Sequence, residues 1–430
     1  MLRPNLQWNL PGANQAEENK SMAKKRKSQS PGHATLSEGK QSKNEIIEEY
    51  LKRNYAFRYN TIKCKPEYKS MDSCRPFIPV TRFILNSFKR ELDKNLGLST
   101  SAENIRGILE SDFSPKINPV REYFENLPRM NPVINRFIET LAETAQVTNP
   151  EKWLLYLTKW LVGVVANALN DFGCQNHLCL VLTGEQGRFK TTWLDNICPL
   201  SLRSYLFTGK IDPQSKDILT LIAEYLFINI DDQLKALNKR DENELKNLIT
   251  TPAVKYRRPY DVYIEEYPHL ASFMASVNGN DFLTDPTGSR RFLPFEVVKM
   301  DLKAAQEINM DNVFSEVLFI YESGFRYWFD DAEIEELNQY SSGFHVQTAE
   351  FEMLIQGFEK PPKDATDFMT TTQILNYLRA YCSLNLSEKR MGEALRKAGF
   401  ERRSKRIGNN PVYAWSVKKI TPNPFISYKL

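Results

Sequence analysis

Residues 177–196, HLCLVLTGEQGRFKTTWLDN, decide the fold of this chain. An apolar run at 178–182, rich in strand-forming residues, is followed by a loop with Gly184 and Gly187 and then by a segment of helical character. Such a loop binds phosphate well, because backbone N–H groups of the loop and of the helix N-terminus converge on the anion. The stretch therefore predicts an α/β fold built around a phosphate-binding loop.

The usual form of this loop is G-x-x-x-x-G-K-[ST], and residues 184–191 follow it with one exception. Phe189 stands where the second glycine belongs, and we expect Gly187 to take over the flexible role. A chance match in a strand–loop–helix is the alternative on this stretch alone, and the later motifs weaken it. The expected nucleotide-binding residues are Gly184, Glu185, Gln186, Gly187, Arg188, Phe189, Lys190, Thr191 and Thr192.

The sequence allows two positions for the side chain of Phe189. It either crowds the β-phosphate of a bound nucleotide, or it packs on the core while Gly187 absorbs the strain. We expect the second arrangement.

A second motif, YLFINIDD at residues 225–232, is a run of strand formers that ends in two adjacent acids. In phosphate-loop ATPases one such acid holds Mg²⁺ and the next orients the attacking water. We therefore assign Asp231, with Thr191, to the metal and Asp232 to the water. The alternative is a strand that ends in a turn with exposed acids.

A third apolar strand, LASFMASVNGN at residues 270–280, ends in the polar residue Asn278. That side chain is placed to sense the γ-phosphate, although Asn-Gly is also an ordinary turn dipeptide.

Two arginines follow just beyond this strand, in DPTGSRRFLPF at residues 285–295. Arg290 or Arg291, reaching into the site of a neighbouring subunit, would stabilise charge that develops on the transferred phosphate. For at least one of the two we expect the alternative role, a structural salt bridge at a subunit surface. With Lys190, Asp232 and Asn278, these arginines complete the expected catalytic set.

Basic and aromatic residues alternate in TTPAVKYRRPYDVYIEEY at residues 250–267. Lys255, Arg257 and Arg258 would contact phosphates, while Tyr256 and Tyr260 would offer faces to the bases of a single strand. An intersubunit salt-bridge loop is an equally good interpretation, because two glutamates follow.

The order of these motifs resembles that of the virulence-associated protein E family, whose members are ring-forming ATPases similar to superfamily 3 helicases. The resemblance spans roughly residues 130–345 and is most specific at NDFLTDPTGSRRF. It implies a hexameric or related ring, ATP and Mg²⁺ as cofactors, hydrolysis between subunits and a role in replicating mobile DNA. Phe189 departs from the pattern, and Gln233 follows the acids, so that Asp232 must serve alone as the catalytic acid.

The last part of the sequence, residues 370–415, is typical of a winged helix. Ser387 is a fair N-cap for a helix that ends near Gly399, and two strand-like runs then flank a Gly-Asn-Asn-Pro turn. Such a helix can enter the major groove of duplex DNA, although winged helices also bind proteins. The expected DNA contacts here are Lys389, Arg390, Arg402, Arg403, Lys405 and Arg406.

The composition of the chain bears on its partners, on metal sites and on its location in the cell. A net charge of +4 says little about partners, and six cysteines without a C-x-x-C pair beside four histidines argue against zinc or an iron–sulfur cluster. No apolar window is long enough for a membrane span, and no signal peptide is evident, so we expect a cytoplasmic protein.

We divide the chain into a disordered basic tail (1–43), a mostly helical region (44–132), a helical collar with a P-loop, AAA+-like ATPase core of the superfamily 3 type (133–345), a linker (346–367) and a winged helix (368–420). The expected function is that of an ATP-dependent DNA helicase or translocase of a mobile element or prophage. It would act on single-stranded DNA inside a homo-oligomeric ring and cooperate with a separate primase. The alternatives are a nucleotide-switched DNA-binding factor with little or no hydrolysis, and a regulatory or defence ATPase.

Overall fold

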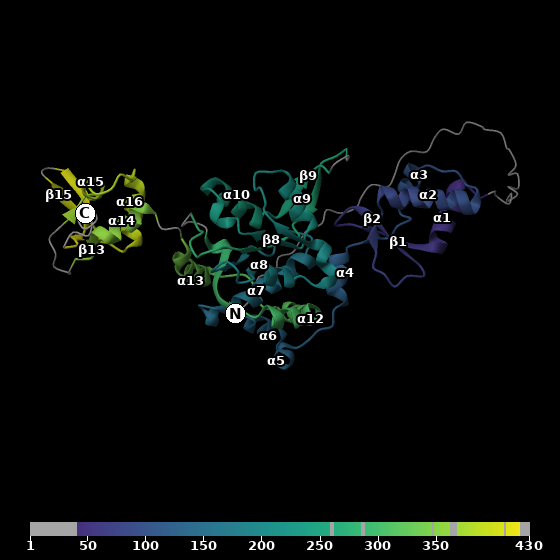
Figure 1. Ribbon diagram of the computed structural model, residues 1–430, viewed down its shortest axis with the longest axis horizontal. Coiled ribbons are helices and arrows are strands. Elements are labelled where there is room, and N and C mark those ends of the chain that lie inside the picture. The colour runs from purple at the N-terminus through teal and green to yellow at the C-terminus, as the bar shows by residue number, and fades with distance from the viewer. Residues whose placement is uncertain are drawn as a thin grey trace, which may run out of the picture.

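The computed structural model describes residues 41–258, 262–284, 289–345, 348–361, 368–407 and 410–421. Three parts follow one another along the chain, each with its own sheet and core, and Figure 1 shows them side by side along the long axis. The expected tail falls almost entirely outside the described residues.

The N-terminal part combines helices with a sheet of order β3-β2-β1-β4. Its elements are α1 (Lys43–Asn54), β1 (Tyr55–Asn60), β2 (Lys65–Ser70), β3 (Ile78–Pro79), α2 (Arg82–Leu96), α3 (Ala102–Leu109), β4 (Lys116–Ile117) and α4 (Pro119–Asn126). The last helix, α4, packs through Val120 and Phe124 in the core of the central part. The expectation of a mostly helical region missed this sheet. On one face of β1, Tyr55 and Phe57 pack against Phe88 of α2, with ring centroids 4.8 and 5.8 Å apart.

The central part is built on a six-stranded sheet of order β5-β12-β6-β11-β8-β7. Its strands are β5 (Ala145–Val147), β6 (Cys179–Thr183), β7 (Leu206–Gly209), β8 (Phe227–Asp231), β11 (Ser272–Ser276) and β12 (Phe292–Met300). All neighbours pair in parallel except β5 with β12, which confirms the mostly parallel sheet predicted from the sequence. The third motif strand, β11, lies between β6 and β8.

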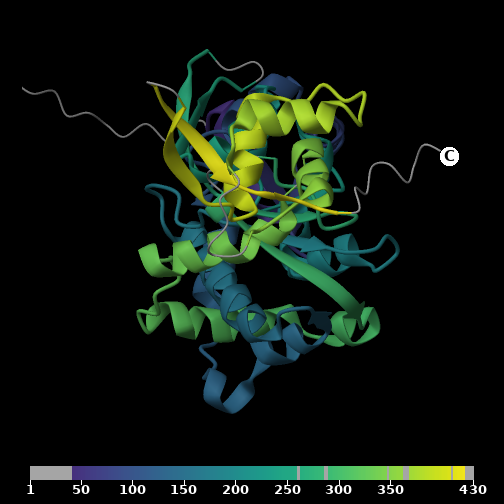
Figure 2. The same cartoon turned by 90° about the vertical axis from the view of Figure 1, so that its left-hand side faces the viewer.

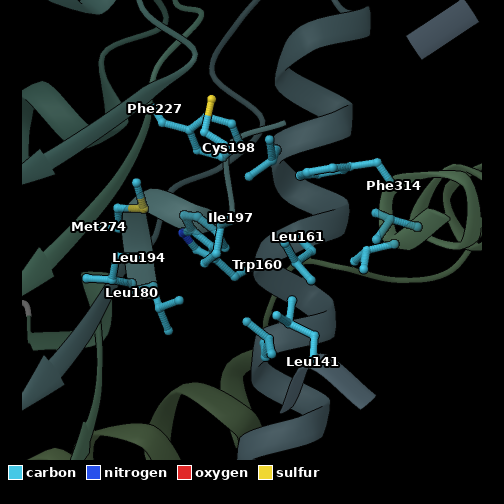
Figure 3. Packing of buried hydrophobic residues seen from close by; sticks show 14 of the residues in the cluster. Leu141, Trp160, Leu161, Leu180, Leu194, Ile197, Cys198, Phe227, Met274 and Phe314 are labelled. Carbon is cyan, nitrogen blue, oxygen red and sulfur yellow. The ribbon is translucent and has the colours of Figure 1, made fainter. Parts of the chain in front are cut away.

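Alternate residues of these strands bury themselves on opposite faces of the sheet, because successive side chains of a strand point to opposite sides. On one face, Leu180 and Met274 pack with Trp160 of α7 (Pro150–Leu169) and with Leu194 of α8 (Lys190–Asn196), as Figure 3 shows. On the other, Val181 and its neighbours pack with α9 (Asp217–Glu224) and α10 (Lys239–Thr250). Within the described chain, no helix combines the length and the apolar character that a membrane crossing requires.

The remaining helices and strands complete the central part. They are α5 (Pro132–Asn135), α6 (Phe137–Glu143), η1 (Leu200–Tyr205), η2 (Leu234–Ala236), β9 (Ala253–Tyr256), β10 (Glu265–Pro268), η3 (Ser289–Arg291), α11 (Leu302–Glu307), α12 (Met310–Glu322), α13 (Asp331–Ser341) and η4 (Ser342–Phe344).

The C-terminal part begins earlier than the sequence suggested. Its elements are α14 (Ala349–Gly357), β13 (Phe358–Glu359), β14 (Phe368–Met369), α15 (Thr371–Arg379), α16 (Glu388–Lys397), β15 (Arg402–Ile407), β16 (Asn410–Ser416) and β17 (Lys418–Lys419). Residues 346–367 were expected to be a linker, but Leu354 and Phe358 belong to the same buried cluster as Met391 and Trp415. Burying these apolar side chains makes α14 a structural member of this part, which faces the viewer in Figure 2.

Candidate functional site

The loop that joins β6 to α8 has three residues in unusual backbone conformations. Gly184 has a φ of 126°, and a Cβ atom there would lie 2.9 Å from the carbonyl oxygen of Val297, so only glycine fits without a shift of the neighbouring strand. Gly187 has a φ of 82° and Phe189 a φ of 57°. The chain therefore needs a left-handed conformation at position 189, which explains why glycine is the usual residue there.

The side chain of Phe189 is 58% exposed. The expectation that it packs on the core is therefore wrong, and Gly187 does not absorb the strain for it, because both residues are left-handed. Phe189 instead forms the N-cap position of α8 without a side-chain capping bond.

Lys190 opens α8 and turns its ammonium group back onto the loop. Its Nζ atom donates to the carbonyl oxygens of Gly184 and Glu185 at 3.0 and 2.6 Å, and to Oδ1 of Asn278 at 3.2 Å. Only 5% of the residue is exposed, and this burial lowers the pKa of Lys190. The lysine is thus held at the centre of the loop by acceptors that an anion could replace.

Thr191 and Asp231 meet at the carboxyl edge of the sheet. The Thr191 hydroxyl lies 2.8 Å from Oδ1 of Asp231 and 2.9 Å from the hydroxyl of Ser276, which itself donates to the same carboxylate oxygen at 3.1 Å. Oxygen ligands of this kind suit Mg²⁺. Sequence reasoning missed Ser276, which lies opposite Asp231 in the register of β11 and β8.

Asp232 and Asn278 form a second pair beside the first. Oδ1 of Asp232 accepts from the backbone N–H of Asn278 at 3.0 Å, and Oδ2 accepts from its side-chain amide at 2.7 Å. Asn278 therefore contacts both Asp232 and Lys190. Gln233 does not contact this pair, because its side chain forms hydrogen bonds with the backbone of Ile211.

The other loop residues lie at the surface. Glu185, Gln186 and Thr192 are exposed, and Arg188 forms an ion pair of 2.6 Å with Glu185. The described residues contain no group of three or more His, Cys, Asp or Glu side chains arranged to hold a metal.

Arg290 and Arg291 lie at the opposite end of the strands of the same sheet, where β6 and β12 begin. They immediately precede β12, whose first residue, Phe292, is in register with Cys179 at the start of β6. The loop at residues 184–189 follows the other end of β6, so the structure does not bring the arginines to the candidate site of their own chain. Residues 285–288 of this motif lie outside the described residues.

The basic stretch before β11 forms a hairpin of β9 and β10. Lys255 is exposed and pairs with Glu266 across the strands at 2.8 Å, and Arg257 is exposed. Arg258, however, has a side chain only 10% exposed, and it contacts Glu224 at 3.3 Å and the carbonyl oxygen of Ile62 at 3.0 Å. Because its side chain is buried and paired, Arg258 is not available as the DNA contact that the sequence suggested. Tyr260 lies outside the described residues.

In the C-terminal part the basic residues separate into two groups. Lys389 and Arg390 are exposed on α16. Arg402 stacks over Tyr413, 4.5 Å from the ring centre, and Arg403 pairs with Glu401 at 2.7 Å. The side chains of Lys405 and Arg406 lie outside the described part of the chain.

The virulence-associated protein E-like domain matches residues 131–346, half of the chain. The protein therefore belongs to the virulence-associated protein E-like family, and the matched span contains the whole central part.

Among the solved structures that are similar to the chain are three of one protein region. The first is the apo structure of NrS-1 C terminal region (305-718), with 10% identity and a TM-score of 0.49; the match covers 88% of this chain and 100% of that one. The second is an A form apo structure of the same region, with 11% identity and a TM-score of 0.46; the match covers 87% of this chain and 98% of that one. The third is a further A form apo structure, with 10% identity and a TM-score of 0.45 over 87% and 99%. No curated protein sequence matches the chain.

Proposed function

We propose that this protein is an ATP-dependent DNA helicase or translocase that serves the replication of a mobile element or prophage. The observation that carries the proposal is the connected set of polar side chains at the carboxyl edge of the central sheet. Lys190 contacts Asn278, Asn278 contacts Asp232, and Thr191 contacts Asp231. A core of P-loop, AAA+-like type with a C-terminal winged helix accounts for this arrangement and for the strand order.

The residues at this edge fit a nucleotide with Mg²⁺. Lys190 would exchange the carbonyl oxygens that it now binds for phosphate oxygens, and the loop N–H groups would complete the anion site. Thr191 and Asp231 would hold the ion, which supplies charge stabilisation at the phosphates. Asp232, oriented by two hydrogen bonds from Asn278, would position the water that attacks.

Hydrolysis would take place between adjacent copies of the chain in a ring, in the expected case a hexamer. Arg290 and Arg291 are at the sheet edge that is opposite their own phosphate-binding loop. A head-to-tail contact would bring the arginine edge of one copy to the loop edge of the next. An arginine supplied in this way stabilises the charge of the transferred phosphate.

DNA would contact two places. The exposed Lys255 and Arg257 of the β9–β10 hairpin are the best cations for a single strand in the ring, and α16 with its exposed Lys389 and Arg390 is the best element for duplex. A separate primase would supply the primers.

The test is ATP hydrolysis by the purified protein with and without single-stranded DNA. We expect stimulation by DNA in the natural sequence and no hydrolysis in Lys190→Ala. Lys94→Ala, which removes an exposed lysine of α2 in the N-terminal part, is the matched control and should hydrolyse normally. Undiminished hydrolysis in Lys190→Ala would contradict the assignment of the loop.

Sharing of the site is tested by mixing two inactive variants. Asp232→Asn and the double variant Arg290→Ala/Arg291→Ala should each hydrolyse little ATP alone and regain activity together, because mixed rings contain some interfaces with both groups intact. No recovery, with subunit exchange verified, would count against a site between subunits.

A second function, a DNA-binding factor switched by nucleotide with little hydrolysis, is favoured by one observation. The left-handed residue beside Lys190 is phenylalanine, and its exposed ring lies next to the loop that would hold the phosphates. Tight binding of ATP without turnover, and DNA binding that changes with nucleotide, would support this function over the first.

A further inference from the structure

A cavity of about 260 Å³ opens at the arginine edge of the central sheet. It lies between the segment after α7, the start of β12 and the segment before α13. The described residues that line it include no carboxylate, and five of them carry the argument: Gln175, Arg290, Arg291, Tyr327 and Trp328.

No acidic side chain among the described residues pairs with the two arginines of this cavity. Nε of Arg291 is buried without a hydrogen-bond partner, and neither Arg290 nor Arg291 forms an ion pair with a described residue. Burial, together with the charge of Arg290, lowers the pKa of Arg291. Buried arginines are usually paired with a carboxylate, as Arg258 is with Glu224. An unpaired, partly buried cation favours an anion from outside.

The wall opposite the arginines is aromatic and held in place. The hydroxyl of Tyr327 donates to Oε1 of Gln175 at 2.9 Å, and Nζ of Lys159, a residue of α7 that is 3% exposed, donates to the carbonyl oxygen of Trp328 at 3.2 Å. These bonds hold the phenol of Tyr327 and the backbone of Trp328, and the residue Trp328 remains 58% exposed. An exposed indole offers a face on which a planar ring can stack.

We propose that this cavity is a nucleotide subsite in which Trp328 stacks on the base while Arg290 and Arg291 contact phosphate. The inference rests on the proposed function, because the nucleotide would come from a neighbouring copy or from bound DNA. The cavity is smaller than the roughly 300–1,000 Å³ of sites that enclose a whole small ligand. It therefore covers part of a nucleotide, and another molecule or strand holds the rest. Both arginines line the cavity, and Arg290 is exposed whereas Arg291 is half-buried.

The experiment is a fluorescence titration of the full chain. The other described tryptophans, Trp153, Trp160, Trp193 and Trp415, are buried, so Trp328 is the exposed reporter within that part of the chain. A nonhydrolysable ATP analogue with Mg²⁺, or a short single-stranded oligonucleotide, should quench the emission by stacking. Trp328→Phe should lose the quenching, and inorganic tripolyphosphate, which has no base, should cause none.

The source of the nucleotide follows from Lys190→Ala. If quenching by the ATP analogue disappears in this variant, the base belongs to the nucleotide on a neighbour's loop; if only the oligonucleotide quenches, it belongs to DNA. Trp328→Leu should weaken binding of that ligand about tenfold, since stacking on one base is worth roughly 1–3 kcal/mol, and Trp328→Phe should keep most of the affinity.

No quenching by either ligand, or equal quenching in Trp328→Phe, would overturn the subsite. Because the readout is binding, these outcomes are separate from a failure of the proposed function, which is measured by hydrolysis.

Discussion

The hydroxyl of Thr191 lies 2.8 Å from Oδ1 of Asp231 and thereby joins the first turn of α8 to the end of β8. Two segments far apart in the sequence meet at one carboxylate, with Ser276 of β11 as the third partner. Three adjacent elements thus converge on the point where the proposed function requires a metal.

Thr191→Val removes the hydroxyl and keeps the size of the side chain. We expect Mg²⁺-dependent binding of an ATP analogue to weaken by at least about tenfold, because an oxygen ligand and a hydrogen bond to Asp231 are both lost. Thr191→Ser keeps both and should bind normally. Calorimetric titration with and without Mg²⁺ measures the difference, and equal affinities of the two variants would contradict the metal assignment.

Phe189→Gly should stabilise the protein relative to Phe189→Ala. Both variants remove an exposed ring, but only glycine adopts the left-handed conformation without cost, and the difference should be about 1 kcal/mol in the free energy of unfolding. Urea unfolding of the two variants, followed by circular dichroism, measures it. Equal midpoints would show that position 189 stores no strain.

His269 should make stability depend on pH. Its ring is buried, with Nδ1 2.8 Å from the carbonyl oxygen of Thr251 and Nε2 2.9 Å from that of Ala271. Burial lowers the pKa of His269 from 6.5 to about 4, against the effect of both carbonyl groups, and His177 adds to the lowering.

Between pH 6.5 and about 4 the unfolded chain therefore binds a proton that the folded chain does not, and the free energy of unfolding falls as the pH falls. His269→Gln removes this titration. Its unfolding free energy should decline less steeply, by up to about 1.4 kcal/mol per pH unit. Urea unfolding at several pH values tests this, and parallel curves for both proteins would refute it.

DNA binding should divide between two regions. Lys255→Ala/Arg257→Ala should weaken nucleotide-dependent binding of single strands and reduce the slope of log affinity against log salt by roughly 0.7 for each lost contact. Ending the chain after His345, before the buried α14, should weaken duplex binding most. Fluorescence anisotropy with both substrates measures each effect. Similar losses on both substrates from both variants would show that the regions are not separate sites.

Local patterns in the sequence predicted most of the candidate site. The loop, both acids and Asn278 occupy the edge that was expected, since each motif combines a strand with polar residues at its end. Ser276 was missed because a serine at a strand end is common. The burial of Arg258 was also missed, because Ile62 and Glu224, its partners, are far away in the sequence.

The N-terminal sheet escaped prediction for a related reason. Its strands are short, and only the alternation of Tyr55, Phe57 and Tyr59 signals β1. Their packing against α2 decides the structure, and this tertiary contact is not visible in a local window. Likewise, Pro361 made residues 346–367 resemble a linker, although Leu354 is completely buried.

The contacts of the turn between β1 and β2 bear on where this protein can be cut. Asn60 donates to the hydroxyl of Tyr205 at 2.7 Å, and Arg258 reaches back to Ile62. A fragment that starts at residue 131, where the family match begins, would leave Arg258 and Tyr205 without these partners. The N-terminal part, which lies outside the matched span, therefore supplies hydrogen-bond partners to the central part and to the base of the β9–β10 hairpin.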